Sequence, residues 1–310
     1  MRVFPAIAAA ALLALGAGSP AGAETADAPP AACPQGQAVS FGDLAAMHKA
    51  ILYGEYHGTM QMPAVFAGEV AKAAAGGRRV LVALEYPPDW QDDLDATMAA
   101  PDELAALDAF DTHHTQDGRT SDAMRNLLLQ LRALKLAGAD IHVVAADSRR
   151  FRSAADKAAV AGLDLPAGVD PVLGVRDLDL ALHSKAACEA VQCDLILLYA
   201  GNMHTRLTTL ESGMMNMQTG KMTPFRTAPA GFVLKQFMPV ASVYLAHRGG
   251  WATNRRGNFV SMAEVDPAVP AYAAEDGVYY CAGADNVSHM FSVGKIKSSA
   301  DTLAPAPETQ

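Results

Sequence analysis

The chain has 310 residues, a formal net charge of −9 at pH 7, and 51% hydrophobic residues. This acidic composition, without a Lys/Arg stripe, lacks the basic face needed to bind phosphates, so nucleic acid is not an expected partner. After the first residues, no apolar run is long enough for a transmembrane helix. We therefore expect a small-molecule or peptide substrate and no membrane span, and the oligomeric state stays open.

The first 23 residues have the features of a secretory signal peptide. Arg2 is followed by an apolar segment from Ala6 to Leu15 that is too short to span a bilayer, and Ala21-Gly22-Ala23 is a small-residue cleavage site. We expect a mature periplasmic or secreted chain that begins at Glu24.

Four cysteines are an even number for a chain in an oxidising compartment, and we interpret them as two disulfides. Three connectivities are possible. We favour a local Cys188–Cys193 loop and a Cys33–Cys281 link between the two ends. A metal site formed by these cysteines is less favoured, because the C-x4-C pair has no second pair to complete a ligand set.

Apolar runs alternate with helical periodicity over the first two thirds of the chain. Four runs of Val, Ile, Leu and Ala lack polar alternation, as do strands that are buried on both faces of a parallel sheet. These strands are predicted at Ile51–Tyr53, Val80–Leu84, Ile141–Ala146 and Leu195–Ala200. Helices are predicted at 41–49, 63–76, 90–98, 104–110, 122–136 and 176–191. The alternation predicts an α/β fold with a mainly parallel, helix-covered sheet.

The last third of the chain loses this helical periodicity. Apolar segments between Gly, Asn and Asp turns predict strands at Phe232–Phe237, Pro239–Ala246 and Val278–Cys281. The expected organisation is a signal peptide over 1–23, a linker over 24–40, a single α/β domain over 41–297 with a β-rich extension from about residue 214, and a disordered tail over 298–310.

Reactive side chains follow all four apolar runs. They are Glu55 and His57, Glu85, Asp147 and Arg149, and His204. Ligands of open α/β sheets bind outside the carboxyl ends of the strands, so we expect these groups to meet there. In the two Gly-x-x-His motifs, at 54–57 and 201–204, the glycine lets the backbone turn so that the histidine points back over the sheet edge.

This combination predicts a hydrolytic site. His57, His204, Glu55 and Glu85 could hold a divalent Mn, Zn or Co ion with a position open for a nucleophilic water. Without metal, a histidine or glutamate could activate water as a general base. Asp147 could orient an imidazole, and Arg149 could bind a developing oxyanion or a substrate carboxylate. Each residue alone also fits a structural role, and only their coincidence favours a site.

Two other features fit a structural role better than a functional one. The segment Asp111–Arg119 breaks the helical periodicity and contains groups that could bind a ligand or metal, but a solvated loop is favoured. Methionines near the two histidine motifs are expected to form an adaptable apolar lid, with Cu(I) binding as a less favoured alternative.

Three motifs together resemble the ChaN/Tiki group of proteins, which is related to TraB-type proteins and more distantly to erythromycin esterases. They are Gly54-Glu55-Tyr56-His57, Leu84-Glu85-Tyr86-Pro87 and Gly201-Asn202-Met203-His204, and the helix that begins at Arg176-Asp177 is also similar. The resemblance covers roughly residues 50–206. The single residue between Glu55 and His57 matches the ChaN pattern, whereas erythromycin esterases have two residues there.

The resemblance implies two activities. Tiki-like members are metal-dependent proteases, for which His57, Glu55, Glu85 and His204 would be the metal or catalytic set. ChaN-like members bind haem in iron uptake, for which Tyr56, Tyr86 or a site histidine would be the axial ligand. Our leading expectation is metal-assisted hydrolysis of a small ester, amide or peptide bond, and the alternative is a haem-binding protein.

Overall fold

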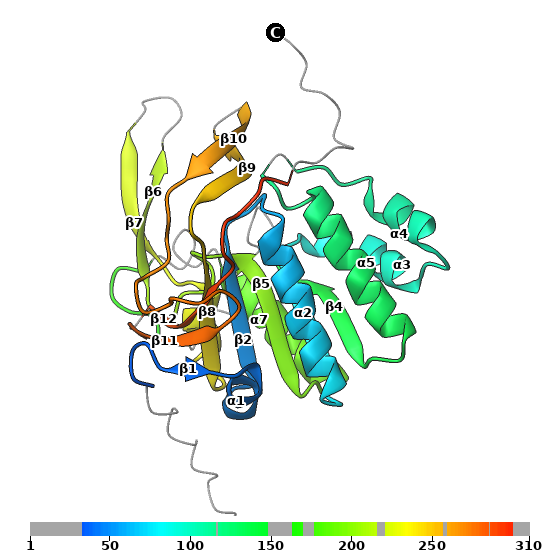
Figure 1. Ribbon diagram of the computed structural model, residues 1–310, viewed down its shortest axis with the longest axis horizontal. Coiled ribbons are helices and arrows are strands. Elements are labelled where there is room, and N and C mark those ends of the chain that lie inside the picture. Colours follow the sequence, from blue (N-terminus) through cyan, green and yellow to red (C-terminus); the bar gives the residue numbers. More distant parts are fainter. Residues whose placement is uncertain are drawn as a thin grey trace, which may run out of the picture.

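The computed structural model describes residues 33–299, except for residues 116, 148–162, 170–176, 216–220, 257–258 and 285. One sheet contains β1 (Ala38–Val39), β2 (Ala50–Glu55), β3 (Val80–Leu84), β4 (Ile141–Ala145), β5 (Leu195–Gly201), β8 (Val240–Ala246), β11 (Tyr279–Ala284) and β12 (Val287–Ser292). The strand order is β1-β11-β12-β8-β2-β5-β3-β4 (Figure 1). Neighbours from β12 to β4 are parallel, whereas β1 and β11 add antiparallel. The predicted mainly parallel α/β fold is confirmed.

The four predicted apolar runs form the adjacent strands β2, β5, β3 and β4. β5 lies between β2 and β3, although it follows both in the sequence. Its last residue, Gly201, is the register partner of Glu55 at the end of β2. The carboxyl ends of β2, β5 and β3 therefore lie side by side.

Helices cover both faces of this sheet. Alternate residues of each central strand point to opposite faces, and on each face they pack with helices in a separate apolar cluster. In β2, Ile51 and Tyr53 pack into one cluster and Leu52 into the other. The first cluster is covered by α1 (Phe41–Met47), α2 (Gln61–Ala75), α3 (Gln91–Ala99), α4 (Glu103–Phe110) and α5 (Asp122–Leu136), with a 3-10 turn at Pro88–Trp90 (Figure 1). The second is covered by α7 (Leu178–Val191) and α8 (Ala230–Leu234).

The later part of the chain is β-rich, as predicted. It adds β8, β11 and β12 to the sheet and two antiparallel pairs, β6 (Leu210–Met215) with β7 (Met222–Thr227) and β9 (Gly250–Arg256) with β10 (Phe259–Val265). The prediction of a strand at Phe232–Phe237 was wrong. Ala230, Val233 and Leu234 are buried at helical spacing in α8, and together they pack into the second apolar cluster.

Both favoured disulfides, Cys33–Cys281 and Cys188–Cys193, are confirmed. Two disulfides fit an exported protein, and residues 1–23, expected as the signal peptide, lie outside the described residues. Within the described part, none of the helices combines the length and apolar character that crossing a membrane requires. β1 falls inside the segment expected as a linker, where it pairs with β11.

Candidate active site

The first half of the site is a buried carboxylate and imidazole at the end of β2. Glu55 is 4% exposed, and its two oxygens accept from different groups. The Tyr199 hydroxyl donates to Oε2 at 2.5 Å, and His57 Nδ1 lies 2.5 Å from Oε1. Because a carboxylate accepts, this contact places a proton on His57 Nδ1 and directs Nε2 away from Glu55.

Segments remote in sequence fix the loop that carries His57. Gly58 follows it with a φ of +74°, and the Gly58 carbonyl accepts from the Thr253 amide of β9 at 3.0 Å and from the Ser299 amide at 2.9 Å. A Cβ at Gly58 would lie 1.7 Å from the Thr253 carbonyl oxygen. Only glycine fits this turn, so β9 and the C-terminal segment both position His57.

The second half of the site repeats this geometry at the end of β5. The chain turns after Gly201, and His204 Nδ1 lies 2.6 Å from Oδ1 of the buried Asp177, which directly precedes α7. A Cβ on Gly201 would lie 3.1 Å from His57 Nε2 and 3.3 Å from His204 Cδ2. Glycine at this position therefore leaves room for both imidazoles.

Glu85, the residue after β3, lies between the two histidines. Its Oε2 is 3.7 Å from His57 Nε2, and its Oε1 is 3.4 Å from His204 Nε2. The Gly201 amide donates to Oε2 at 2.8 Å. The structure thus brings Glu55, His57, Glu85 and His204 together at one point of the sheet edge.

Arg119 joins the site from the loop that was expected to be a solvated connection. Its Nη1 donates to Glu85 Oε1 at 3.2 Å and to Asp147 Oδ2 at 3.3 Å, and its Nη2 contacts Asp117 at 2.7 Å. Asp147, expected to orient an imidazole, thus contacts this guanidinium. Arg149, expected as the substrate anchor, lies outside the described residues.

Sequence reasoning missed the roles of Arg119 and Asp177. The density of His, Asp and Arg in the 111–119 loop was the available signal for Arg119. For Asp177 the signal was its place at the start of a helix, which entered only through the family resemblance.

Neighbouring charges set the protonation states of His57 and Glu85. Burial of His57 disfavours its imidazolium, but Glu55 and Glu85 outweigh this and raise the pKa to about 9. Burial disfavours the Glu85 carboxylate, but His204, His57 and Arg119 lower its pKa to about 2. At neutral pH, His57 is protonated and Glu85 ionised.

The two tyrosines considered as haem ligands lie in different environments. Tyr86 is 1% exposed, its hydroxyl donates to the Arg119 carbonyl at 2.8 Å, and its ring packs against Trp90. Tyr56 is partly exposed, and its ring centroid lies 6.1 Å from that of His247.

No protein-family profile matches the sequence, and no curated protein matches it at a significant level. The chain is similar in structure to a mutant of the erythromycin esterase EreC in its open conformation, with a TM-score of 0.56, 11% identity, and coverage of 85% of this chain and 94% of that chain. It is also similar to a succinoglycan biosynthesis protein, with a TM-score of 0.55, 9% identity, and coverage of 83% and 90%.

A third similar structure is ChaN of Campylobacter jejuni with cofacial haem, at a TM-score of 0.36, 13% identity, and coverage of 67% and 86%. The first two likenesses show a shared fold, so the chain has the fold of erythromycin esterases, the group to which the ChaN/Tiki proteins are more distantly related.

Proposed function

We propose that the protein is a hydrolase that activates water between His57 and His204 to cleave a small ester, amide or peptide bond. The observation that carries the proposal is the paired arrangement of the two imidazoles. Each directs Nδ1 to a buried carboxylate, Glu55 or Asp177, and Nε2 to the shared carboxylate of Glu85. A carboxylate on Nδ1 fixes the orientation of a catalytic imidazole and stabilises its protonated form.

The charge states suggest a division of roles. Because its pKa is about 9, His57 is protonated at neutral pH and would donate from Nε2 to the leaving group. His204 Nε2 would accept a proton from the attacking water, and Asp177 would stabilise the resulting imidazolium. The hydroxide equivalent joins the acyl group, the leaving group takes the His57 proton, and solvent returns a proton from His204 to His57.

Arg119 and Glu85 would organise the centre between the imidazoles. Glu85 lies between the two Nε2 atoms and would hold both imidazoles in position. Arg119 contacts Glu85, Asp147 and Asp117, so its position is fixed by three carboxylates. A guanidinium held in this way can stabilise negative charge that develops on a carbonyl oxygen.

A divalent metal does not fit this arrangement. Among the described residues, the possible ligand atoms of His57, Glu85 and His204 do not all lie within 4.8 Å of one another. The two Nε2 atoms approach different oxygens of Glu85, and the Arg119 guanidinium occupies one of them. A cation at Glu85 would have to be placed beside this fixed positive charge, so we derive no step through a metal.

The test is a hydrolysis screen of the mature protein with p-nitrophenyl esters of several acyl lengths and with fluorogenic peptide amides. We expect turnover that persists after chelator treatment and falls at least about a hundredfold in His204→Gln, because a general base is lost. His142→Gln is the matched control, since His142 is half-exposed beside Asp140 at the start of β4. Activity that a chelator abolishes and one of the metals Mn, Zn or Co restores would support the metal-assisted route instead.

Haem capture is the second candidate, and Tyr56 is the observation in its favour. It lies one residue from the site histidine and is partly exposed, whereas the Tyr86 hydroxyl is used inside the protein. A saturable Soret shift on haem titration that disappears in Tyr56→Phe, in a protein without hydrolytic turnover, would replace the hydrolase proposal.

A further inference from the structure

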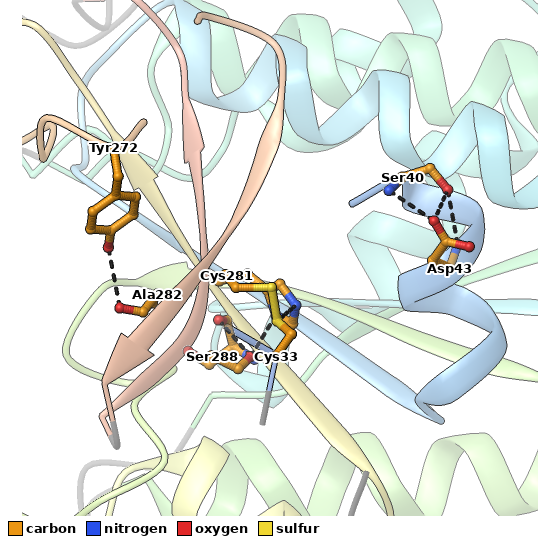
Figure 2. The surroundings of a disulfide bond; sticks show 9 residues. Cys33, Ser40, Asp43, Tyr272, Cys281, Ala282 and Ser288 are labelled. Carbon is orange, nitrogen blue, oxygen red and sulfur yellow. Dashed lines mark hydrogen bonds between the residues drawn. A yellow bond between two sulfur atoms is a disulfide. The ribbon is translucent and has the colours of Figure 1, made fainter. Parts of the chain in front are cut away.

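A cluster of sulfur and imidazole groups lies away from the site described above. Cys281 of β11 and His289 of β12 are direct partners in the antiparallel ladder. Cys33 of the N-terminal segment is linked to Cys281 by a disulfide (Figure 2). Cys33 Sγ is 3.5 Å from His289 Nε2. The sulfur and nitrogen atoms of the three residues all lie within 4.8 Å of one another. In the structure the two sulfurs are bonded to each other, so they can bind a metal only after the disulfide is reduced. Two thiolates and an imidazole are then a ligand set for zinc.

The imidazole is already oriented for this role. His289 Nδ1 contacts the Ser288 hydroxyl at 2.8 Å, which leaves Nε2 facing the sulfurs. Metal-binding histidines use such a second contact to fix ring orientation and tautomer. His289 is 3% exposed and Cys281 is fully buried, whereas Cys33 is partly exposed, so solvent reaches the cluster from the side of Cys33.

A second buried histidine, His48, packs against the ring of His289. The His48 ring meets the His289 ring edge-on, with centroids 6.2 Å apart, and its Nδ1 contacts the Leu44 carbonyl at 2.9 Å. His48 is 8% exposed and His289 is 3% exposed, so the two rings enclose each other away from solvent.

We infer that Cys33, Cys281 and His289 form a redox-gated site for Zn²⁺, closed by the disulfide and opened when a dithiol reduces it. In the first step, the dithiol transfers two electrons and two protons to the disulfide, leaving two thiols in the protein and a disulfide in the reductant. In the second, Zn²⁺ binds both sulfurs as thiolates together with His289 Nε2, releases two protons, and keeps a water as its fourth ligand.

Zinc binding would preserve the link that the disulfide makes. In the oxidised protein, Cys33 anchors the N-terminal segment to β11, next to the β1–β11 pairing. A zinc ion held by the same two sulfurs would anchor that segment after reduction. This inference does not depend on the proposed hydrolysis, because none of its three ligands belongs to the hydrolytic site.

The test uses the mature protein, reduced anaerobically with dithiothreitol, freed of reductant and titrated with Co²⁺ as a spectroscopic probe for Zn²⁺. We expect one equivalent to give thiolate-to-cobalt charge-transfer and tetrahedral d–d absorption, only after reduction and reversed by Zn²⁺. His289→Gln should weaken Co²⁺ binding at least tenfold, and Cys33→Ser/Cys281→Ser should abolish the bands.

The other disulfide supplies the matched control. Cys188→Ser/Cys193→Ser lacks the local loop only and should bind Co²⁺ like the wild type. Bands that survive in Cys33→Ser/Cys281→Ser, or no bands in the reduced wild type, would overturn the inference. If reduction loosens the fold, Zn²⁺ should raise the Tm of the reduced wild type more than that of the reduced His289→Gln variant. Equal Tm values of the reduced wild type with and without Zn²⁺ would also overturn the inference.

Discussion

Replacing Glu55 by Gln should lower the pKa of His57 by about two units, the effect of removing an opposite charge in direct contact. Glu55 is the first of the two carboxylates that raise this pKa from 6.5 to about 9 against the cost of burial. A rise of that size corresponds to about 3 kcal/mol of preference for the imidazolium. Without Glu55, Glu85 still opposes the effect of burial, so the pKa of His57 should fall to about 7, close to its ordinary value of 6.5.

The same shift links stability to pH. The folded-state pKa of His57 lies above its unfolded value, so its contribution to the free energy of unfolding is complete below pH 6.5 and is lost as the pH rises to about 9. In Glu55→Gln, that loss between pH 6.5 and 9 should largely disappear, which urea unfolding at several pH values would measure.

NMR titration of the imidazole Cε1–Hε1 signals measures the pKa directly and needs no substrate. Asp177→Asn is the matched control, because Asp177 contacts His204 and should leave the pKa of His57 within about half a unit. A wild-type pKa of His57 near 6.5, or equal shifts in the two variants, would refute this account of the charge states.

Two further substitutions test how the site is held. Gly58→Ala and Gly77→Ala both place a side chain at positive φ, which costs about 1–3 kcal/mol. Of the two, only the Cβ at position 58 would meet a carbonyl oxygen of β9, at 1.7 Å. Urea unfolding should therefore show a clearly larger loss of stability for Gly58→Ala, and equal losses would contradict the proposed fixing of the His57 loop by β9. Tyr199→Phe removes a hydroxyl that donates to the buried Glu55 and should lower the free energy of unfolding in urea by about 1.5–3 kcal/mol. Tyr272→Phe removes only a 3.4 Å contact with the Ala282 carbonyl and should cost less than about 0.5 kcal/mol. Similar losses in the two variants would show that the Glu55 contact does not stabilise the fold.

The sequence predicted the centre of the sheet because burial on both faces leaves a simple signal. The runs that became β2, β3 and β5 lack polar alternation, and their carboxyl ends carry the ionisable groups. The order of these strands was not predictable from local pattern, since nothing in a strand's own residues says that β5 lies between β2 and β3. This order brings the two histidines to opposite sides of Glu85.

Features that depend on tertiary contacts were the ones that local patterns missed. Arg119 reaches Glu85 from a loop with no periodicity, and its place follows from the contact of Gly118 with Gly58. The segment that became α8 is short and apolar, and periodicity over five residues does not distinguish a helix from a strand. Likewise, a zinc ligand set divided among residues 33, 281 and 289 has no sequence spacing to find.

A comparison of His57→Gln, His204→Gln and the double variant with the wild type tests most directly whether the two histidines form one catalytic centre. The measured quantity is kcat/KM on the best substrate of the hydrolysis screen. Residues that act as a unit are strongly non-additive, so each single variant should lose at least about a hundredfold and the double variant no more than about tenfold beyond the worse single. Losses that multiply in the double variant, or a single variant with the wild-type rate, would contradict a shared centre.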